Sequence, residues 1–260
     1  MPVHSAKMNE MATVDSRENR AFAYEIKFLV PKEQALRLRE WARGCMRPDP
    51  NSACGTGDGY RITSLYYDSG ELAVFHKRGS FGRCKYRVRR YDASPMIFLE
   101  RKLRSERLVT KRRTLVNLSE LERLRQDECD RRWSGAWFQR RMLARGMQPS
   151  CQVSYQRTAL VSENGSGLVR LTMDEDLRAW KVQGPEFHAL SGGKLLLRDH
   201  MILEMKFRLA MPVMFKQVLE EYRLEAQPIS KYRLAVTGLG FAPPTAPLET
   251  MMLQAEAAYA

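Results

Sequence analysis

Arginine and lysine recur at every second position in a stretch that otherwise has the composition of a β-strand. The stretch "KYRVRRY" places Lys85, Arg87 and Arg89 two residues apart. Residues two apart in a strand point to the same face, so these three cations share one face and repel one another. Arginine binds phosphate oxygens in pairs and lysine acts as a point charge. A phosphate chain is therefore the counter-charge that this pattern favours.

The same pattern recurs in four later stretches, namely "FLERKLR" with Glu100 and Lys102, "VTKRRTL" with Lys111 and Arg113, "SYQRTAL" with Tyr155 and Arg157, and "ILEMKFR" with Glu204 and Lys206. In one strand alone, the simplest interpretation is that one face packs on the core and the other meets solvent. Exposed strand faces usually mix threonine, serine, glutamate and lysine. Three of these faces instead carry cation pairs two residues apart, namely Lys102 with Arg104, Lys111 with Arg113, and Lys206 with Arg208. The repetition favours polar faces that line a partly enclosed space and bind an anion.

Two glutamates lie among these cations, Glu204 in "LEMK" and Glu100 in "LERK". A carboxylate repels phosphate unless it pairs with a neighbouring cation or holds a divalent ion. Mg²⁺ or Mn²⁺ bound by one or two carboxylates, with phosphate oxygens completing the shell, is the usual arrangement. The residues leave both interpretations open, and the metal role suits Glu204 better than Glu100.

The overall charge also indicates an anionic partner. The chain has 260 residues, 43 Lys+Arg and 30 Asp+Glu, which gives a net charge of +13. Nucleic acid, an anionic membrane surface and a small polyanion are the candidate partners. No helix-turn-helix, zinc-finger, KH or RNP signature is present, so nucleic acid is not the expected partner. There is no GxxxxGK[ST] loop either, so an ATP site would not be of the P-loop kind.

The remaining composition is typical of a soluble cytoplasmic protein. Hydrophobic residues make up 44% of the chain, which is enough for a core. The five cysteines are scattered without CxxC spacing, which indicates reduced thiols and neither a zinc site nor a disulfide framework. No apolar run reaches the roughly 18–20 residues of a membrane span, and the N-terminus is too polar for a secretory signal.

Periodicity and turn signals predict many strands with helices between them. The predicted strands are 21–30, 60–68, 84–92, 96–104, 109–117, 151–160, 168–176 and 201–209, and the predicted helices are 31–46, two or three within 119–146, 211–224 and 229–239. Ser119 followed by Glu122 suggests a capping box. We expect disorder in 1–19, a folded domain over 20–240 and a flexible tail over 241–260. The fold class is α+β, with a closed antiparallel barrel or a strongly curved sheet.

These motifs together resemble the VTC domain, the polyphosphate-polymerase domain of the vacuolar transporter chaperone complex, within the CYTH or triphosphate tunnel metalloenzyme superfamily. The resemblance extends from Tyr24 to Gly240 and rests on the order of "YEIKF", "ITSLYYDS", "KYRVRRY", "FLERK", "TKRR", "SYQRTAL", "VRLTMDEDL", "LEMKF" and "ISKY". It implies a closed tunnel of about eight antiparallel strands, with helices packed around it and a basic lumen.

The resemblance further implies a metal-dependent phosphotransferase that passes the γ-phosphate of ATP to a polyphosphate chain, with Mn²⁺ or Mg²⁺ as cofactor. It assigns catalytic roles to Lys27, Arg87, Arg89, Lys102 and Arg157. It assigns substrate binding to Lys77, Lys111, Arg113, Tyr155, Lys206, Ser230 and Lys231, and metal binding to Glu204. The expected ligands are ATP and polyphosphate.

Two departures from the family pattern are visible. Hydrolases of the superfamily resemble ExExK in the first strand, and Ala23 occupies the first position here, which weakens a triphosphatase or cyclase interpretation. The run "QPISK" lacks a lysine that family members often have before the "SK" pair. Hydrolysis of tripolyphosphate or nucleoside triphosphates, and polyphosphate binding without catalysis, are the alternatives. No phosphate-sensing SPX domain or membrane segment is attached, so regulation and translocation would need other chains or are absent.

Overall fold

The computed structural model describes residues 16–21, 24–50, 58–104, 108–164, 167–208 and 210–257. The chain divides into two compact units. Unit 1 contains Thr63–Gln152, Lys181–Ala189 and the described residues before Phe22, and unit 2 contains Phe22–Ile62, Val153–Trp180 and Leu190–Ala260. Three strands, β4 (Gly59–Ser69), β8 (Met147–Asn164) and β9 (Gly167–Lys181, through its last residue), contribute residues to both units.

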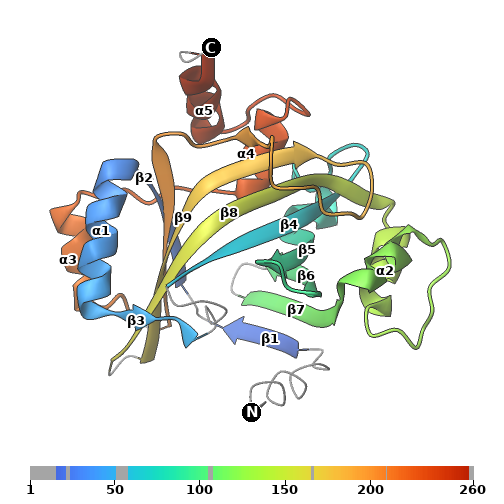
Figure 1. The fold of residues 1–260 in the computed structure, drawn as a ribbon, viewed down its shortest axis with the longest axis horizontal. Helices are drawn as coiled ribbons and strands as arrows, with labels where there is room; N and C mark the ends of the chain where they lie inside the picture. The colour runs from blue at the N-terminus through green and yellow to red at the C-terminus, as the bar shows by residue number, and fades with distance from the viewer. Residues whose placement is uncertain are drawn as a thin grey trace. The chain divides into compact units, whose positions relative to one another are not determined.

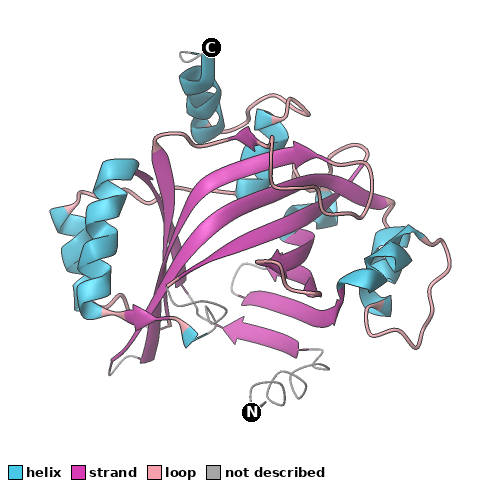
Figure 2. Cartoon of the chain, viewed as in Figure 1, coloured by secondary structure: helices cyan, strands magenta, loops and turns pink. Residues whose placement is uncertain are grey.

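Unit 1 is an antiparallel sheet with three short helices among its described residues (Figures 1 and 2). Its strands are hydrogen-bonded in the order β1 (Ser16–Ala21), β7 (Leu108–Asn117), β6 (Met96–Arg104), β5 (Cys84–Tyr91) and β4. The helices are η2 (Gly79–Arg83), η3 (Leu118–Arg125) and α2 (Ala136–Leu143). Trp137 of α2 is buried and donates from Nε1 to Thr114 Oγ1 of β7 at 2.8 Å, so α2 packs on the face that contains Thr114.

Unit 2 is a second set of neighbouring strands with four helices. Its strands follow the order β8, β9 (Gly167–Lys181), β11 (His200–Phe207) and β2 (Tyr24–Pro31), with β3 (Arg47–Pro48) paired to β8 and β10 (Lys194–Leu195) paired to β9. The helices are α1 (Lys32–Cys45), α3 (Val213–Glu221), α4 (Lys231–Gly238) and α5 (Pro247–Ala257). No helix among the described residues is long and apolar enough to cross a bilayer.

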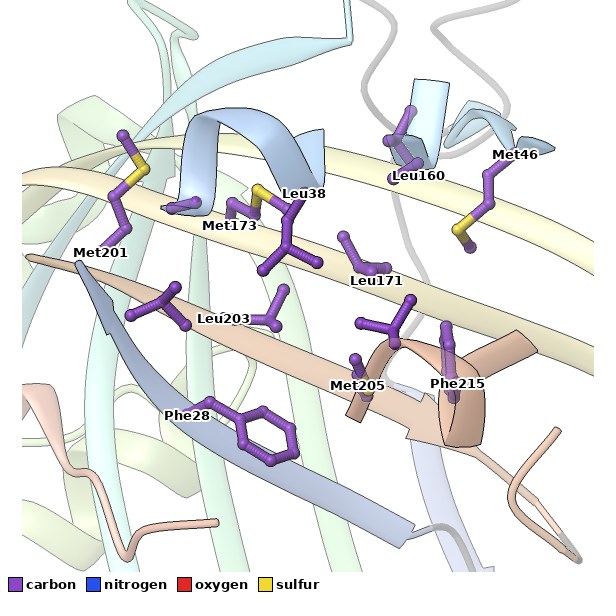
Figure 3. Close-up of a cluster of buried hydrophobic side chains, with 14 of the residues drawn as sticks. Phe28, Leu38, Met46, Leu160, Leu171, Met173, Met201, Leu203, Met205 and Phe215 are labelled. Atoms are coloured by element: carbon purple, nitrogen blue, oxygen red, sulfur yellow. The ribbon is translucent and has the colours of Figure 1, made fainter. Parts of the chain in front are cut away.

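The core of unit 2 lies on one face of its strands (Figure 3). Leu203 of β11 is opposite Phe28 of β2 and Met173 of β9, so one apolar row crosses three strands. Leu38 of α1 and Phe215 of α3 complete this buried cluster. Because strand residues alternate between faces, the polar residues at the intervening positions point away from this core.

The structure confirms an antiparallel sheet with helices but not a closed barrel. In the strand order, β1 stands at one end, where it pairs with β7, and β2 stands at the other, where it pairs with β11. Closure would require these two terminal strands to pair, and the described residues contain no such pairing. Each predicted strand overlaps an observed one, and 96–104 matches β6 at both ends. The prediction over 21–30 wrongly joins Ala21 of β1 to β2, and 22, 23 and 209 lie outside the described residues.

The prediction of disorder over 1–19 is wrong for residues 16–19, which belong to β1. The register pairs Ser16 with Arg113 and Asn19 with Thr110. The sequence "SRENRA" has no apolar alternation and therefore carries no strand signal. It can still form an edge strand, because backbone hydrogen bonds to the neighbouring strand hold it. The rest of the predicted disordered segment, 1–15, lies outside the described residues.

The prediction of a flexible tail over 241–260 is wrong for the described part, which contains α5. Met252 and Glu249 of this helix are buried. Arg233 of α4 donates from Nε to Glu249 Oε1 at 2.7 Å, and Glu249 also accepts from the backbone N–H of Thr245. An ion pair to α4, the preceding helix, holds α5, and an ion pair leaves no apolar pattern in the sequence.

Of two helices predicted from the sequence, one begins at a different cap and the other is confirmed. The capping box begins at Asn117 and not at Ser119: Asn117 Oδ1 accepts from the Ser119 N–H, and Glu120 Oε2 accepts from the Asn117 N–H. Asparagine is as strong a cap as serine, so the two candidate starts were equivalent in the sequence. The predicted helix over 229–239 is confirmed as α4, with Ser230 as its N-cap.

Replacing Phe215 by alanine should lower the free energy of unfolding by about 3–5 kcal/mol, because its fully buried ring would leave a cavity between α3 and the strands. Urea denaturation followed by circular dichroism measures this loss. Val213→Ala on the same helix is the control, since Val213 is 68% exposed and should change stability by less than about 0.5 kcal/mol. Equal effects of the two substitutions would contradict the packing of α3.

Candidate functional site

The first polar cluster lies on the face of unit 1 opposite α2. The register places Arg87 of β5, Glu100 of β6 and Arg113 of β7 side by side. Arg87 Nε lies 2.7 Å from Glu100 Oε2, and Arg113 Nε lies 3.1 Å from Oε1. Lys111 Nζ is 3.8 Å and Arg89 Nη1 4.0 Å from the same carboxylate, whose side chain is 3% exposed. One buried carboxylate thus has four cations around it, and we call these five residues the Glu100 cluster.

The cations keep Glu100 ionised. Burial acts to raise the pKa of Glu100, but the positive charges of Arg87, Arg89, Lys111 and Arg113 outweigh it and hold the pKa far below its usual range. With four cations against one carboxylate, the cluster has a large positive excess. Among the described side chains this excess favours binding of an anion.

Lys111 of this cluster and the neighbouring Tyr91 change charge near pH 8. Burial lowers the pKa of Lys111 to about 8, although Glu100 acts in the opposite direction. Burial raises the pKa of Tyr91, but the positive charges of Arg89 and Arg113 outweigh it and leave the pKa at about 8. Arg113 Nη2 also donates to Tyr91 Oη at 3.1 Å. Above pH 8 the cluster therefore loses one positive charge and gains one negative charge.

A row of three lysines lies next to the Glu100 cluster. The register places Lys85 opposite Lys102 and Lys102 opposite Lys111, on the same face as Glu100. Like charges directly opposite each other destabilise a strand pair. An anion bound along this face would relieve that repulsion, which extends the anion-binding character of the face from the arginines to the lysine row.

The second cluster is in unit 2 and centres on the fully buried Asp174 of β9. Arg157 of β8 donates from Nε to Oδ1 at 2.6 Å and from Nη2 to Oδ2 at 2.7 Å. Lys231, the first residue of α4, places Nζ 2.5 Å from Oδ2. Both cations also lie over the Tyr155 ring, at 5.3 Å and 4.7 Å from its centroid. Burial acts to raise the pKa of Asp174, but Arg157 and Lys231 outweigh it and lower the pKa.

The third cluster, also in unit 2, alternates carboxylates and lysines on β2 and β11. Lys206 Nζ lies 2.6 Å from Glu204 Oε1 and 3.5 Å from Glu25 Oε2. Lys27 Nζ lies 3.8 Å from Glu204 Oε2 and 3.2 Å from Glu25 Oε1, and it donates to the Ile229 carbonyl at 3.3 Å. Burial acts to raise the pKa of Glu204, but Lys206 and Lys27 outweigh it and hold the pKa well below its usual range.

The donors of this third cluster fit a divalent ion that takes most of its ligands from phosphate and water. The described residues contain no group of three or more histidine, cysteine or acidic side chains that could enclose a metal alone. Glu204 and Glu25 supply two neighbouring carboxylates, and the buried Thr172 Oγ1, opposite Glu204 in the register, has no hydrogen-bond partner among the described residues. Asp174 does not fit, because Arg157 and Lys231 occupy both of its oxygens.

The structure brings together most of the residues that the sequence selected. In unit 1 these are Arg87, Arg89, Lys102, Lys111 and Arg113, and in unit 2 they are Lys27, Tyr155, Arg157, Glu204, Lys206, Ser230 and Lys231. Lys77 is different. It lies exposed in a turn with φ 55° and makes no ion pair with any described residue. The functional role of each of these residues stays a prediction.

Two residues of the clusters were missed in the sequence. Asp174 lies in "VRLTMDED" two positions after Thr172, and Glu25 lies in "YEIK" two positions before Lys27. In both cases the period of two already placed the acid on the polar face. Alternation alone does not identify the partners of these acids, because Asp174 binds Arg157 of β8 and Lys231 of α4, which lie far from it in the sequence or on another strand.

Replacing Glu100 by glutamine should lower the free energy of unfolding at pH 7 by about 3 kcal/mol, since it leaves four cations without their buried counter-charge. Urea denaturation at a series of pH values measures the effect. Glu122→Gln is the matched control: this exposed acid pairs with Arg125, and its loss should cost less than about 1 kcal/mol.

The difference in free energy of unfolding between the wild type and Glu100→Gln should decrease at low pH. The pKa of Glu100 is lower in the folded chain than the value of about 4.3 expected when unfolded, so its stabilisation is complete above pH 4.3 and is lost as the pH falls further. The wild type and Glu100→Gln should therefore converge in stability below about pH 4. A difference that is constant from pH 7 to pH 2 would contradict an ionised Glu100.

Comparisons with known proteins agree with this architecture. The family model described as VTC domain matches residues 22–239. No curated protein sequence matches the chain. Among solved structures, a putative adenylate cyclase from Bacillus halodurans is similar with a TM-score of 0.50 and 14% identity, covering 82% of this chain and 95% of that one. A putative adenylyl cyclase from Hippeastrum with dominant triphosphatase activity has a TM-score of 0.45 and 15% identity, covering 88% and 99%.

The Bacillus halodurans similarity concerns the fold alone, because its sequence identity is low. The family match is of a different kind. It covers most of the chain and contains every strand and helix that forms the three clusters. This chain therefore belongs to the VTC domain family.

Proposed function

We propose that this chain is a metal-dependent phosphotransferase that passes the γ-phosphoryl group of ATP to the end of a phosphate or polyphosphate chain. The observation that carries the proposal is the Glu100 cluster, in which four cations surround one buried carboxylate. Membership of the VTC domain family supports the same substrate class.

The charge excess favours a condensed phosphate over a simple ion. Cations that are partly removed from water have lost hydration energy, and that loss is recovered only when an anion supplies matching charge and hydrogen-bond acceptors. A chain of phosphate groups carries its charges at regular intervals, as the rows of cations across β5, β6 and β7 do. Arginine forks such as those of Arg87 and Arg113 suit pairs of phosphate oxygens.

The reaction needs positioning and charge neutralisation more than covalent chemistry. An oxygen of the acceptor phosphate forms a bond to the γ-phosphorus while the bond to the β-phosphate oxygen breaks, and ADP leaves. Negative charge spreads over the three equatorial oxygens during this step. In unit 1 we assign phosphate binding and charge neutralisation to Arg87, Arg89 and Lys102. In unit 2 we assign catalytic roles of the same kind to Lys27 and Arg157.

A divalent ion completes the proposed site. Glu204 and Glu25 would hold Mn²⁺ or Mg²⁺, with phosphate oxygens and water as the remaining ligands. Bound there, the ion would neutralise phosphate charge next to the two lysines of the third cluster. Lys206 and Lys27 already orient both carboxylates, so these residues are held in place before substrate binds.

Incubation with ATP and Mn²⁺, followed by gel electrophoresis of the products, tests the proposal. We expect long polyphosphate chains in the presence of Mn²⁺ and no chains when EDTA is added from the start to bind the metal. Free phosphate as the sole product would favour a triphosphate hydrolase of the same fold. Unchanged ATP together with tight polyphosphate binding would favour a module that binds without catalysis.

The double variant Arg87→Ala and Arg89→Ala should lower chain synthesis by at least about 10²-fold, by analogy with the loss of a single transition-state hydrogen-bond donor. The same gel assay measures the loss, and circular dichroism establishes that the variant is folded. Arg131→Ala with Arg132→Ala removes the same charge from exposed positions of unit 1 and should keep wild-type activity. Wild-type activity in the Arg87 and Arg89 variant would refute the assignment.

Polyphosphate binding should weaken between pH 7 and pH 9, because Lys111 loses its proton and Tyr91 becomes anionic near pH 8. Calorimetric titration with tripolyphosphate across this range measures the change in affinity. The variant Lys111→Arg with Tyr91→Phe should bind almost independently of pH, since neither new side chain titrates there. If this variant kept the pH dependence of the wild type, groups other than Lys111 and Tyr91 would control binding.

A further inference from the structure

The helix α4 carries a residue of the second cluster at its start and packs against α5 (Figure 1). Lys231, the first residue of α4, places Nζ 2.5 Å from Asp174 Oδ2 and 4.7 Å from the centroid of the Tyr155 ring. The family match ends at residue 239, and α5 begins at Pro247. The helix that packs against α4 therefore lies outside the segment that the family model matches.

The first turn of α4 has an unfavourable charge for the start of a helix. The N-terminal end of a helix carries a partial positive charge, which favours acids there and disfavours cations. The first turn of α4 contains Lys231 and Arg233 and no acid. Its capping hydrogen bond is also long, since Ser230 Oγ accepts from the Arg233 N–H at 3.4 Å. Acids from other elements supply the negative charge that this turn lacks.

Two buried carboxylates supply that charge, one for each cation. Asp174 of β9 faces Lys231, and Glu249 of α5 faces Arg233. Arg233 donates from Nε to Glu249 Oε1 at 2.7 Å and from Nη2 to Oε2 at 3.3 Å, which is the paired geometry of a guanidinium and a carboxylate. Glu249 also accepts from the Thr245 N–H at 2.8 Å. The start of α4 is thus joined to a carboxylate that is itself fixed.

A second contact joins the other end of α4 to α5. A Cβ placed on Gly238, the last residue of α4, would lie 3.4 Å from Met252 Cε, and Met252 is buried. α5 therefore contacts the first turn of α4 through Glu249 and its last residue through Met252. Two contacts separated along the helix axis fix the position and the direction of α4, and with them the point from which Lys231 extends.

We propose that Glu249 is a positioning residue, which acts through Arg233 to hold the first turn of α4 and so keeps the Lys231 ammonium at Asp174. Asp174 also holds Arg157, so a displaced Lys231 changes the contacts of a residue to which we assign a catalytic role. Small displacements of orienting groups lower a rate strongly. The charge of Lys231 is retained when Glu249 is lost, so turnover should fall more than substrate affinity.

This effect on turnover rests on the proposed phosphotransfer, whereas the effect on the position of Lys231 does not. Amine labelling of the folded chain with acetic anhydride, read by mass spectrometry, measures that position without reference to activity. The Lys231 side chain is 9% exposed, and its labelling requires that it leave Asp174. Glu249→Gln should raise the labelling rate of Lys231 at least about 3-fold, because the first turn of α4 opens more often. The rate of the exposed Lys32 should not change.

An unchanged Lys231 rate in a folded Glu249→Gln variant would overturn the proposal. Thr245→Val is a milder variant at an exposed position, and it removes a hydroxyl that contacts both Arg233 and Glu249. It should raise the Lys231 rate in the same direction, and it decides the matter if Glu249→Gln fails to fold.

Asp58→Asn is the matched control. Asp58 accepts a similar pair of bonds from Arg43 in unit 2, at 2.7 Å and 3.1 Å, and the charge change is the same. Lys231 labelling should not change in this control. Equal increases in Asp58→Asn and Glu249→Gln would attribute the effect to a general loss of stability and overturn the proposal.

A double-mutant cycle tests whether Glu249 acts through Arg233. Arg233→Gln should raise Lys231 labelling as much as Glu249→Gln does, and the double variant should show no further increase, because both substitutions break one contact. A double variant that labels faster than either single variant would show that Glu249 acts by another route, which contradicts the proposal.

Steady-state kinetics of ATP turnover test the consequence for the reaction. Glu249→Gln should lower kcat about 10-fold and leave KM for ATP within about 2-fold of the wild type. A raised KM with an unchanged kcat would overturn the orienting role. If the wild type makes no polyphosphate, the proposed phosphotransfer is refuted, and a raised Lys231 labelling rate still supports the role of Glu249 in holding α4.

Discussion

The structure depends on the neutralisation of cations that are partly buried on strand faces. Removing an ammonium or guanidinium group from water costs several kcal/mol unless an acid compensates it. The chain meets this constraint with a few buried carboxylates that several cations share. Glu100 has four cations around it, and Asp174 binds Arg157 through two hydrogen bonds and Lys231 through a third contact. Loss of one such acid would therefore affect every cation in its cluster.

The same strand register determines both the core and the polar clusters. Leu203 packs between Phe28 and Met173, while its neighbour Glu204 stands opposite Lys27 on the other face. A slip of one residue would place glutamate in the core and leucine among the lysines. Packing of α1 and α3 on the apolar face thus holds the ion pairs in register. The stability of the fold and the geometry of the candidate site cannot vary independently here.

The sequence alone predicts which strand residues share a face, because side chains alternate with a period of two. Arg87 and Arg113 were assigned to polar faces correctly, because alternation follows from local backbone geometry. Which residues stand opposite each other was not predictable, since the pairing of Arg157 with Asp174 depends on long-range register. The β1 strand and α5 were missed for a related reason. Backbone pairing and an ion pair to α4 hold them, and neither leaves an apolar pattern.

The carboxylates of the two units neutralise different shares of the positive charge next to them. Under the proposed function, this difference separates the roles of the clusters. In unit 2, Lys27 and Lys206 have two carboxylates as partners, and Arg157 and Lys231 share Asp174. These side chains are already fixed, so they need little reorganisation when phosphate binds, which is the property that favours catalysis. The Glu100 cluster keeps a large positive excess, which favours affinity for an anion. Under the proposed function, the Glu100 cluster therefore contributes mainly charge for an anion, and the clusters of unit 2 contribute side chains that are oriented before substrate binds.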